Sequence, residues 1–211
     1  MNIILLGKPG AGKGYIAEIL KSEYNFKHIS TGALCRKNIA ENTELGKIVN
    51  QYVSAGGLVP SEVILQMLEQ EVKALKNDNC VFDGYPRTLD QAESLKQIAK
   101  IDAVLFVDVP DNVLIDRVLN RRTCSGCGAP AEVGQVENTC KKCGGALVTR
   151  ADDNIDVVKN RLKVYEESTA PLKEFYSDMI ITLDNSGTVD QTKEKLNKIV
   201  NDLLKNNGEN A

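Results

Sequence analysis

Short apolar segments alternate with longer amphipathic segments along most of this chain. Five of the short segments predict strands that are buried in a sheet: Ile3–Leu6, Phe26–Ile29, Cys80–Phe82, Ala103–Val107 and Met179–Leu183. Between them, apolar residues recur every three or four positions, as they do in amphipathic helices. Strands that alternate with helices predict an α/β fold, in which a parallel sheet of about five strands carries helices on both faces.

The amphipathic segments predict where the helices lie. One follows the first strand, and the others are expected after Thr31, over Glu44–Ser54, from Pro60 to about Lys76, over Thr88–Ala99, after Pro110, after Asn154, from Pro171 and over Val189–Leu204. In the helix after Asn154, the buried stripe is expected to consist of Ile155, Val158, Leu162 and Tyr165.

Two segments interrupt the alternation of strands and helices. Residues 30–59 predict two short helices bounded by glycines, which indicates a small helical insert. Residues 120–153 are rich in glycine and poor in large apolar side chains, so they cannot form a core of their own. We therefore expect a core made of residues 1–29, 60–119 and 154–211, with two inserts at 30–59 and 120–153.

The composition is that of an ordinary globular chain. Of its 211 residues, 42% are hydrophobic and 26% are charged. The net charge of -3 gives no electrostatic reason to expect nucleic-acid binding. No apolar stretch is long enough for a signal peptide or a membrane span. We expect a cytoplasmic protein and, because no apolar helix face is left without a partner, a monomer.

The glycines after the first strand predict a phosphate-binding loop. Gly7, Gly12 and Lys13 have the Gly-x4-Gly-Lys spacing of the P-loop, between a strand and a helix. In such a loop the backbone N–H groups and the helix N-terminus face the phosphates, and the lysine reaches the outer ones. An ordinary glycine-rich turn is the alternative, although the motif stands where phosphate binding needs it. Gly14 occupies the position that usually carries a magnesium-binding Ser or Thr.

A carboxylate and five arginines extend this prediction to phosphoryl transfer. Asp83 directly follows a buried strand, where a carboxylate holds magnesium directly or through water. A single arginine is usually a solvated surface residue, but five stand near predicted strand ends or insert edges: Arg36, Arg87, Arg121, Arg150 and Arg161. The guanidinium fork binds phosphate oxygens in pairs and stays ionised. Two inserts that close over the site would exclude water.

Four cysteines in the second insert predict a metal site. Cys124, Cys127, Cys140 and Cys143 follow a Cys-x2-Cys-x12-Cys-x2-Cys pattern, which favours tetrahedral zinc. A small insert without a core folds only with such help. The central gap is shorter than the usual ~15–20 residues. Iron in place of zinc, or cysteines with no metal, reduced or in disulfides, are the alternatives.

Several motifs, in this order along the chain, resemble those of the adenylate kinases. They are Gly7–Gly14, Ser30-Thr31-Gly32, Gly57-Leu58-Val59, Asp83-Gly84-Tyr85-Pro86-Arg87-Thr88, Gln91, Asp152-Asp153 and Thr169-Ala170-Pro171-Leu172. The resemblance extends to about Leu204 and is to the type with a zinc-binding lid, here shortened. It implies the reversible reaction of ATP with AMP to give two ADP, with Mg²⁺ bound to ATP and a structural Zn²⁺ in the lid.

The resemblance also implies a role for each matching residue. The expected ATP-binding residues are Gly10, Ala11, Gly12, Lys13, Gly14, Tyr15, Arg117, Arg121 and Gly187. The expected AMP-binding residues are Thr31, Arg36, Gly57, Leu58, Val59, Gly84, Arg87, Gln91, Arg150 and Arg161. The catalytic set is Lys13, Arg87, Arg121, Arg150 and Arg161, while Asp83 orders the waters around magnesium.

Three points stay open from the sequence. Tyr15 stands where the family usually has Thr, and its ring could either pack on neighbouring helices or touch the nucleotide. A kinase for UMP or CMP is the nearest alternative, against which Thr31, Thr88 and Gln91 argue. A P-loop protein whose zinc ribbon binds nucleic acid is a third, but the second insert has few cations and no interleaved aromatic residues.

Overall fold

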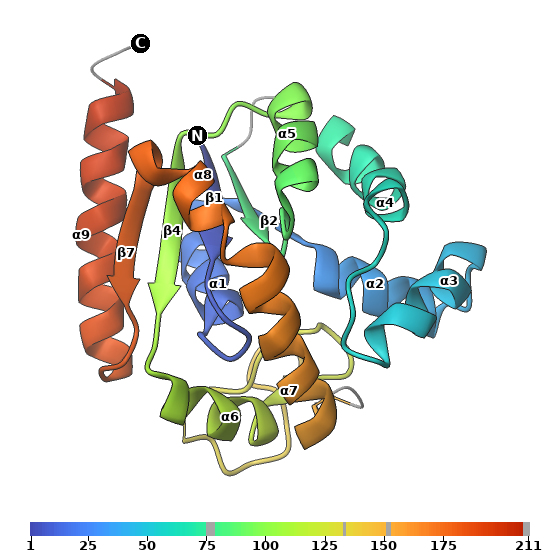
Figure 1. The fold of residues 1–211 in the computed structure, drawn as a ribbon. Coiled ribbons are helices and arrows are strands. Elements are labelled where there is room, and N and C mark those ends of the chain that lie inside the picture. The colour runs from blue at the N-terminus through green and yellow to red at the C-terminus, as the bar shows by residue number, and fades with distance from the viewer. Residues whose placement is uncertain (75–78, 133, 151–152, 209–211) are drawn as a thin grey trace.

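A five-stranded parallel sheet forms the centre of the molecule (Figure 1). The computed structural model describes residues 1–74, 79–132, 134–150 and 153–208. The strands are β1 (Asn2–Leu6), β2 (Lys27–Ser30), β3 (Cys80–Asp83), β4 (Ala103–Asp108) and β7 (Ile180–Asp184), in the order β2-β3-β1-β4-β7. All four pairings are parallel. The predicted fold class and all five predicted strands are confirmed.

The alternation of side chains along β1 divides the core into two clusters. Ile3 and Leu5 pack with residues of α1 (Lys13–Tyr24), α6 (Asp111–Leu119) and α9 (Val189–Gly208). Ile4 and Leu6 pack with residues of α4 (Ser61–Ala74), α5 (Leu89–Ile98) and α8 (Leu172–Phe175). Because successive strand residues point to opposite faces, one apolar run serves both helical layers.

The strand order sets the position of the site. β1 lies between β3 and β4, with Leu5 opposite both Asp83 and Leu105. The connections from β1 therefore leave at the point where the strand order reverses, beyond the carboxyl ends of the strands. The P-loop, Asp83 and the residues after β7 meet at this edge.

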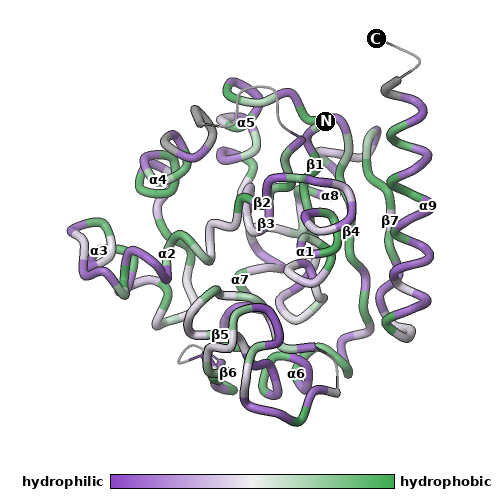
Figure 2. The backbone as a smooth tube through the Cα atoms, turned by 180° about the vertical axis from the view of Figure 1, so that it is seen from behind, coloured by the Kyte–Doolittle hydropathy of each residue, from purple (hydrophilic) through white to green (hydrophobic). Residues whose placement is uncertain are grey.

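The first insert consists of two capped helices. α2 (Thr31–Ala40) begins after Ser30, whose side chain accepts a hydrogen bond from the N–H of Ala33, and α3 (Glu44–Val53) begins after Thr43, which caps Gly46 in the same way. Both views show these helices projecting from the side of the sheet that carries β2 (Figures 1 and 2). The two helices expected within residues 30–59 are confirmed.

The second insert is built around a short antiparallel hairpin. β5 (Arg122–Cys124) pairs with β6 (Leu147–Thr149), a pairing that the sequence did not predict. Its apolar cluster is small, formed by Cys124, Cys140 and Leu147 with Ala131 against them. Figure 2 shows the hairpin near α6, at the same end of the molecule as the P-loop. The expectation that this segment lacks a large core agrees with this cluster.

The structure departs from the predicted elements in three places. In α7 (Ile155–Val164), Ile155 is 40% exposed and Val157 is buried in its place, so the expected stripe is wrong at its first position. A π-helical turn (Tyr165–Thr169) follows α7, and a 3-10 turn (Ser177–Met179) replaces the start of the last strand. α9 continues beyond Leu204 to Gly208. The expected helix end at Lys76 and the motif residue Asp152 lie outside the described residues.

None of the helices in the described residues combines the length and the apolar character that crossing a bilayer requires.

Candidate active site

Three glycines of the P-loop have conformations that other residues rarely adopt. Gly7, Gly10 and Gly12 have φ values of 143°, 89° and 93°. A Cβ on Gly7 would lie 2.5 Å from the carbonyl oxygen of Val107, and one on Gly10 would lie 2.7 Å from that of Leu114. Gly12 caps α1 without a side-chain hydrogen bond, so the first N–H groups of this helix face the loop. The predicted phosphate cradle is therefore present as a loop geometry.

Lys13 points its ammonium group back along the loop. Its Nζ donates to the carbonyl oxygens of Gly7 at 2.7 Å and Lys8 at 3.0 Å. Desolvation lowers the pKa of Lys13 to about 8; Asp83 opposes this shift, and Arg87 and Arg121 add to it. Three cations and one carboxylate thus share one site, an arrangement that favours a bound anion.

Asp83 lies beside Gly14, at the end of β3. A Cβ on Gly14 would be 3.9 Å from Asp83 Oδ2, and His28 Nε2 lies 3.3 Å from the same oxygen. Burial alone would raise the pKa of Asp83, but the hydrogen bond with His28 and the charge of Lys13 outweigh it and hold this pKa below its usual range. An ionised carboxylate facing the loop fits magnesium, which prefers oxygen ligands and retains several waters.

Hydrogen bonds around Gly84 bring three predicted AMP-binding residues together. Thr31 Oγ1 and Arg87 Nε both donate to the carbonyl oxygen of Gly84, at 2.7 and 2.9 Å. The N–H of Arg87 donates to Gln91 Oε1 at 2.8 Å. The hydroxyl of Thr169, in the π-helical turn, donates to the carbonyl oxygen of Arg87 at 2.9 Å. The backbone N–H, the backbone carbonyl and the side chain of Arg87 therefore each have a hydrogen-bond partner.

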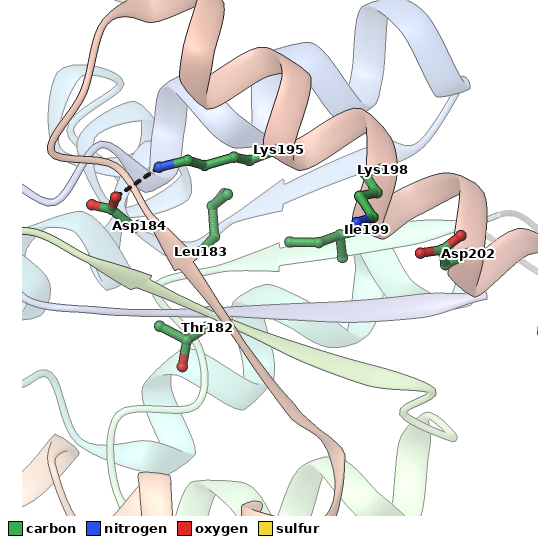
Figure 3. Close-up of a pocket in the computed structure, with 7 residues that line it drawn as sticks. All are labelled: Thr182, Leu183, Asp184, Lys195, Lys198, Ile199 and Asp202. Carbon is green, nitrogen blue, oxygen red and sulfur yellow. Dashed lines mark hydrogen bonds and ion pairs between the residues drawn. The ribbon is translucent and has the colours of Figure 1, made fainter.

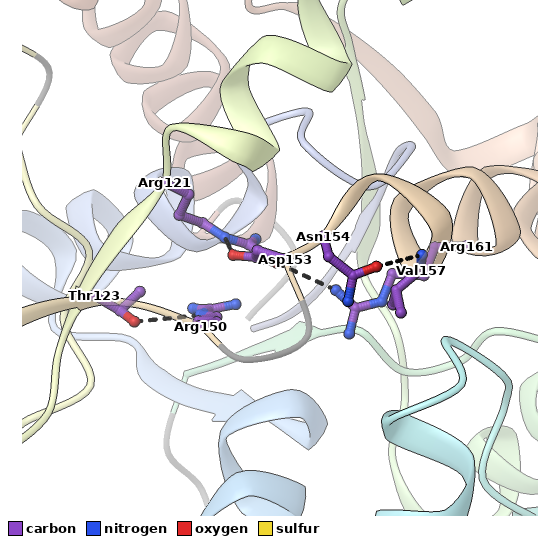
Figure 4. Close-up of polar contacts among 7 residues, drawn as sticks. All are labelled: Arg121, Thr123, Arg150, Asp153, Asn154, Val157 and Arg161. Atoms are coloured by element: carbon purple, nitrogen blue, oxygen red, sulfur yellow. Dashed lines mark hydrogen bonds and ion pairs between the residues drawn. The ribbon is translucent and has the colours of Figure 1, made fainter.

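A buried carboxylate organises the arginines on the side of the second insert (Figure 4). The side chain of Asp153 is 0% exposed. Arg121 binds it through two contacts, of 2.9 Å and 2.5 Å, and Arg161 Nη1 lies 3.5 Å from its Oδ1. Arg150 Nε lies 3.4 Å from the hydroxyl of Thr123 in the hairpin. Figure 4 shows the three arginines near one another, although Arg121 follows α6, Arg150 follows β6 and Arg161 belongs to α7.

Electrostatic coupling joins these groups into one site. The charges of Asp83 and Arg161 both act on Arg87, whose pKa falls mainly because burial disfavours its charged form. Arg36 and Arg87 both oppose the burial that raises the pKa of the Cys35 thiol, so both lie near this cysteine. These couplings connect six of the predicted residues: Lys13, Asp83, Arg36, Arg87, Arg121 and Arg161. Arg150 is placed on this side by its contact with Thr123. The roles of these residues stay a prediction.

The remaining predicted residues lie at the margins of this site. Gly57, Leu58 and Val59 form the link between α3 and α4, with Val59 buried at 8% exposure. Arg117 is in the last turn of α6. Gly187 follows β7 in the loop that leads to α9. The described contacts do not bring Arg117 or Gly187 against the P-loop.

Tyr15 lies in the first turn of α1 and packs against the first core cluster. Partial burial raises the pKa of its phenol, and the charged groups around it include Lys193 and Asp190 of α9. This placement favours a packing role for the ring over contact with the phosphates.

Two hollows lie along β7 and α9. One of about 350 Å³ is lined by Thr182, Leu183, Asp184, Lys195, Lys198, Ile199 and Asp202 (Figure 3). The other, of about 540 Å³, shares Asp184, Lys195 and Lys198 with it and extends to Gly187. Lys195 is bound to Asp184 at 2.7 Å, so its charge is already paired there. Neither lining contains the clustered arginines or Lys13.

The four predicted metal ligands are close together. Their Sγ atoms all lie within 4.8 Å of one another, with Cys124 and Cys143 at 3.4 Å and Cys127 and Cys140 at 3.7 Å. A Zn–S bond of about 2.3 Å gives a tetrahedron with S···S edges of about 3.8 Å. The N–H groups of Cys127 and Gly126 donate to Cys124 Sγ and lower the pKa of this thiol to about 6. The four side chains could therefore hold one metal ion.

Four further polar residues of the site were not predicted from the sequence. Asp153 appeared only as part of a motif, and for His28 the sequence favours a solvated or strand-end role over catalysis. Lys8 bridges Asp111 and Glu166, both at 2.8 Å. Asn185 donates to the carbonyl oxygen of Ala11. No sequence signal marks Lys8 or Asn185, because their partners are distant in the chain.

A P-loop at the reversal point of a parallel sheet, a strand-end carboxylate and convergent arginines define an α/β P-loop protein built to bind phosphates. The family model "Adenylate kinase" matches residues 5–181. The chain is similar to adenylate kinases of Clostridium botulinum, strain Alaska E43 (38% identical; 95% of this chain and 99% of the relative), and of Thermoanaerobacter sp. X514 (39%; 96% and 99%). It is also similar to that of Fervidobacterium nodosum (40%; 95% and 97%). The chain belongs to the adenylate kinase family.

Proposed function

We propose that the chain transfers the γ-phosphoryl group of MgATP to AMP and reversibly gives two molecules of ADP. The observation that carries this proposal is the convergence of Lys13, Asp83, Arg87 and Arg121 in one electrostatically coupled site. Membership of the adenylate kinase family supports both nucleotides as substrates. The physiological role would be adenine nucleotide homeostasis.

The P-loop would hold the ATP phosphates. Its free N–H groups at the start of α1 supply donors, and a bound phosphate would give Lys13 the anionic partner that the loop carbonyls do not provide. The ATP set would comprise Gly10, Ala11, Gly12, Lys13, Gly14, Tyr15, Arg117, Arg121 and Gly187. Within it, Arg117 and the backbone near Gly187 would contact the base, and the packing of Tyr15 makes it the least direct member.

The AMP base would be read by one acceptor and one donor. The hydroxyl of Thr31 donates its hydrogen bond to the carbonyl oxygen of Gly84, so towards a ligand its oxygen can only accept. The side-chain carbonyl of Gln91 accepts from the N–H of Arg87, so its amide NH₂ remains to donate to a ligand. Adenine offers the matching pair, an amino group that donates and a ring nitrogen that accepts. Uracil offers the opposite pair, a carbonyl oxygen that accepts and a ring N–H that donates. Cytosine shares the pattern of adenine and would have to be rejected by ring size. Backbone at Gly57, Leu58, Val59 and Gly84 would add contacts.

The arginines would bind the phosphates that react. Arg36 and Arg87 would hold the AMP phosphate, while Arg121, Arg150 and Arg161 would stabilise charge on the group in transfer. Asp153 keeps Arg121 and Arg161 in place, since both bind its buried carboxylate. No general base is needed, because the attacking phosphate oxygen is already ionised.

Two metals would complete the protein. Asp83 would organise the waters around Mg²⁺, and Gly14 leaves room at this position because it has no side chain. Zn²⁺ would occupy the four cysteines of the second insert, a choice supported by thiolate preference and by the sulfur distances. Magnesium supplies charge neutralisation on the ATP phosphates, and zinc holds the insert together.

We also propose the wider organisation that the sequence predicted. Residues 30–59 would form the AMP-binding insert and residues 120–153 the lid, on a core of residues 1–29, 60–119 and 154–211. The protein would act as a cytoplasmic monomer without nucleic-acid or membrane partners. Analytical ultracentrifugation in the presence and absence of nucleotide would test the oligomeric state.

A coupled assay of ADP formation tests the reaction itself. We expect ADP from ATP plus AMP, none from ATP alone, and at most weak activity with UMP or CMP as acceptors. Preferred turnover of UMP or CMP would favour the alternative monophosphate kinases. Absence of ADP with every acceptor would refute the phosphotransferase and leave the zinc-ribbon binding protein.

A further inference from the structure

A buried amide joins the P-loop to the segment that follows β7. Asn185 is 7% exposed, and its Nδ2 donates to the carbonyl oxygen of Ala11 at 2.7 Å. Its backbone N–H donates to the carbonyl oxygen of Asp108, at the end of β4, at 2.9 Å. One residue thus connects the loop to the ends of two neighbouring strands.

Thr192 of α9 determines which way this amide points. It is 1% exposed, and its Oγ1 lies 2.8 Å from Asn185 Oδ1. The carbonyl oxygen of Ala11 can only accept, so the group that faces it must be the NH₂ of Asn185. The amide oxygen then faces Thr192, whose hydroxyl donates to it. The hydrogen bonds therefore run in one direction, from Thr192 through Asn185 to Ala11.

The amide acts on the peptide unit that closes the cradle. The carbonyl of Ala11 and the N–H of Gly12 belong to one planar trans peptide and point in opposite directions. When Asn185 holds the carbonyl, the N–H of Gly12 is turned to the other side of the loop. The contact is close, since a Cβ on Gly12 would lie 2.4 Å from Asn185 Nδ2.

We propose that Asn185 is a positioning residue for the nucleoside triphosphate. Its amide, oriented by Thr192, aims the N–H of Gly12 at the phosphates and fixes the P-loop to the segment around Gly187 expected beneath the base. This inference rests on the proposed function, because it assigns the loop to ATP. The described hydrogen bonds of Asn185 go to Ala11, Asp108 and Thr192, none of which belongs to the AMP-side group around Gly84.

Steady-state kinetics of variants test the proposal. Asn185→Ala leaves the Ala11 carbonyl without its buried donor, so we expect the KM for ATP to rise about tenfold while the KM for AMP stays within about twofold. Thr192→Val removes only the orienting hydroxyl and should raise the KM for ATP less, whereas Thr192→Ser should recover most of that loss. The double variant should be no worse than Asn185→Ala, because both residues act through one amide.

Tyr24→Phe provides a matched control. Tyr24 donates to Asn197 Oδ1 at 3.0 Å, a hydrogen bond between α1 and α9 at the end of α1 that is farther from the P-loop. This variant should lower Tm and leave both KM values unchanged. If Asn185→Ala behaves like Tyr24→Phe, or raises both KM values equally, the proposal is wrong. If Asn185→Ala does not fold, the comparison of Thr192→Val with Thr192→Ser decides in the same way.

Calorimetric titration with tripolyphosphate separates this proposal from the proposed function. A wild-type chain without phosphotransfer activity would refute the function, yet tripolyphosphate would still probe the loop. Binding that is about tenfold weaker in Asn185→Ala than in wild type supports the positioning role. Equal binding by the two proteins overturns it.

Discussion

Among the individual residues, Lys13 is a buried cation whose charge is poorly compensated. Among the described hydrogen bonds, its ammonium group donates to the backbone carbonyls of Gly7 and Lys8, and Arg87 and Arg121 add to the desolvation that lowers its pKa to about 8. A cationic group contributes most binding free energy to phosphate when its charge is poorly compensated in the free protein, because the ligand then supplies the missing anionic partner. The same feature makes the nucleotide-free protein less stable than its contacts alone would suggest.

Lys13 should therefore give stability a measurable pH dependence. Its folded pKa of about 8 lies below the ordinary value of 10.5, so between these values the unfolded chain binds more protons and stability rises with pH. Lys13→Met has no ammonium group at this position, so it lacks this pH-dependent contribution to stability. In calorimetry without nucleotide, we expect the Tm of wild type minus that of Lys13→Met to become more positive from pH 7 to pH 10. The change should be about 2–4 °C for each kcal/mol of stability gained by wild type relative to the variant.

The matching control for Lys13→Met is Lys21→Met, at a lysine near the other end of the same helix. A constant Tm difference between wild type and Lys13→Met across this pH range would contradict the assignment. Lys13→Met should also lower kcat for ADP formation by about 10²–10³, the usual effect of losing a charge-stabilising group.

Residues recognised by type and spacing were predictable, and residues defined by a distant partner were not. Lys13, Asp83 and the arginines stand within or beside motifs, so the sequence indicated them. Asn185 is a single polar residue just after β7, and His28 is a single polar residue within β2. Their partners, Ala11 and Asp83, lie 174 and 55 positions away and are fixed only when the sheet forms.

Among the secondary-structure elements, Lys8 links the P-loop to both arms of the second insert. Asp111 is the first residue of α6, which leads into the insert, and Glu166 lies in the π-helical turn just after α7, which leads out of it. Hydrogen bonds to these two carboxylates raise the pKa of Lys8 well above its usual value. One side chain thus couples the loop to the segments on which the insert would move.

Lys8→Met should weaken ATP binding without unfolding the protein. Asp111 and Glu166 are 76% and 56% exposed, so each pair contributes at most about 1 kcal/mol. We expect the KM for ATP to rise about two- to fivefold, with the KM for AMP unchanged. Asp111→Asn and Glu166→Gln should each show part of the effect. Identical kinetics in all three variants and wild type would mean that the link is only a surface contact.

Predictions of secondary structure succeeded where one periodicity runs through a whole element. All five core strands and most helices followed from apolar spacing. The π-helical turn did not, because its i→i+5 hydrogen bond from Ala170 to Tyr165 depends on where Thr169 must reach Arg87. The hairpin of the second insert also escaped prediction, since three-residue strands are too short to show a period.

In the whole molecule, both inserts contact elements outside themselves. Asn160 of α7 donates to the carbonyl oxygen of Ala55, at the end of the first insert, at 2.7 Å. Lys142, between the second pair of cysteines, forms an ion pair with Glu18 of α1. The sequence predicted the inserts from their composition. It could not predict these contacts, which join residues 105 and 124 positions apart.

The second insert is the part of the molecule that we expect to depend most on the proposed metal. Among its described residues, the apolar cluster consists of Cys124, Cys140, Leu147 and Ala131, whereas the core has two large clusters. Removing the metal should therefore unfold the insert first and leave the sheet intact. Because Arg121 and Arg150 lie near the two ends of the insert, loss of its structure should also weaken ATP binding.

Cys140→Ser tests this dependence, with Cys80→Ala as the control for losing a buried cysteine of the core. We expect about one zinc per wild-type chain by elemental analysis and none in Cys140→Ser. Calorimetry should show an early transition in Cys140→Ser and in chelator-treated wild type, while Cys80→Ala should shift only the main transition. The KM for ATP should rise in Cys140→Ser and not in Cys80→Ala. Detection of iron in place of zinc would change only the identity of the metal. Unchanged unfolding and unchanged ATP binding after removal of the metal would show that the insert folds without it.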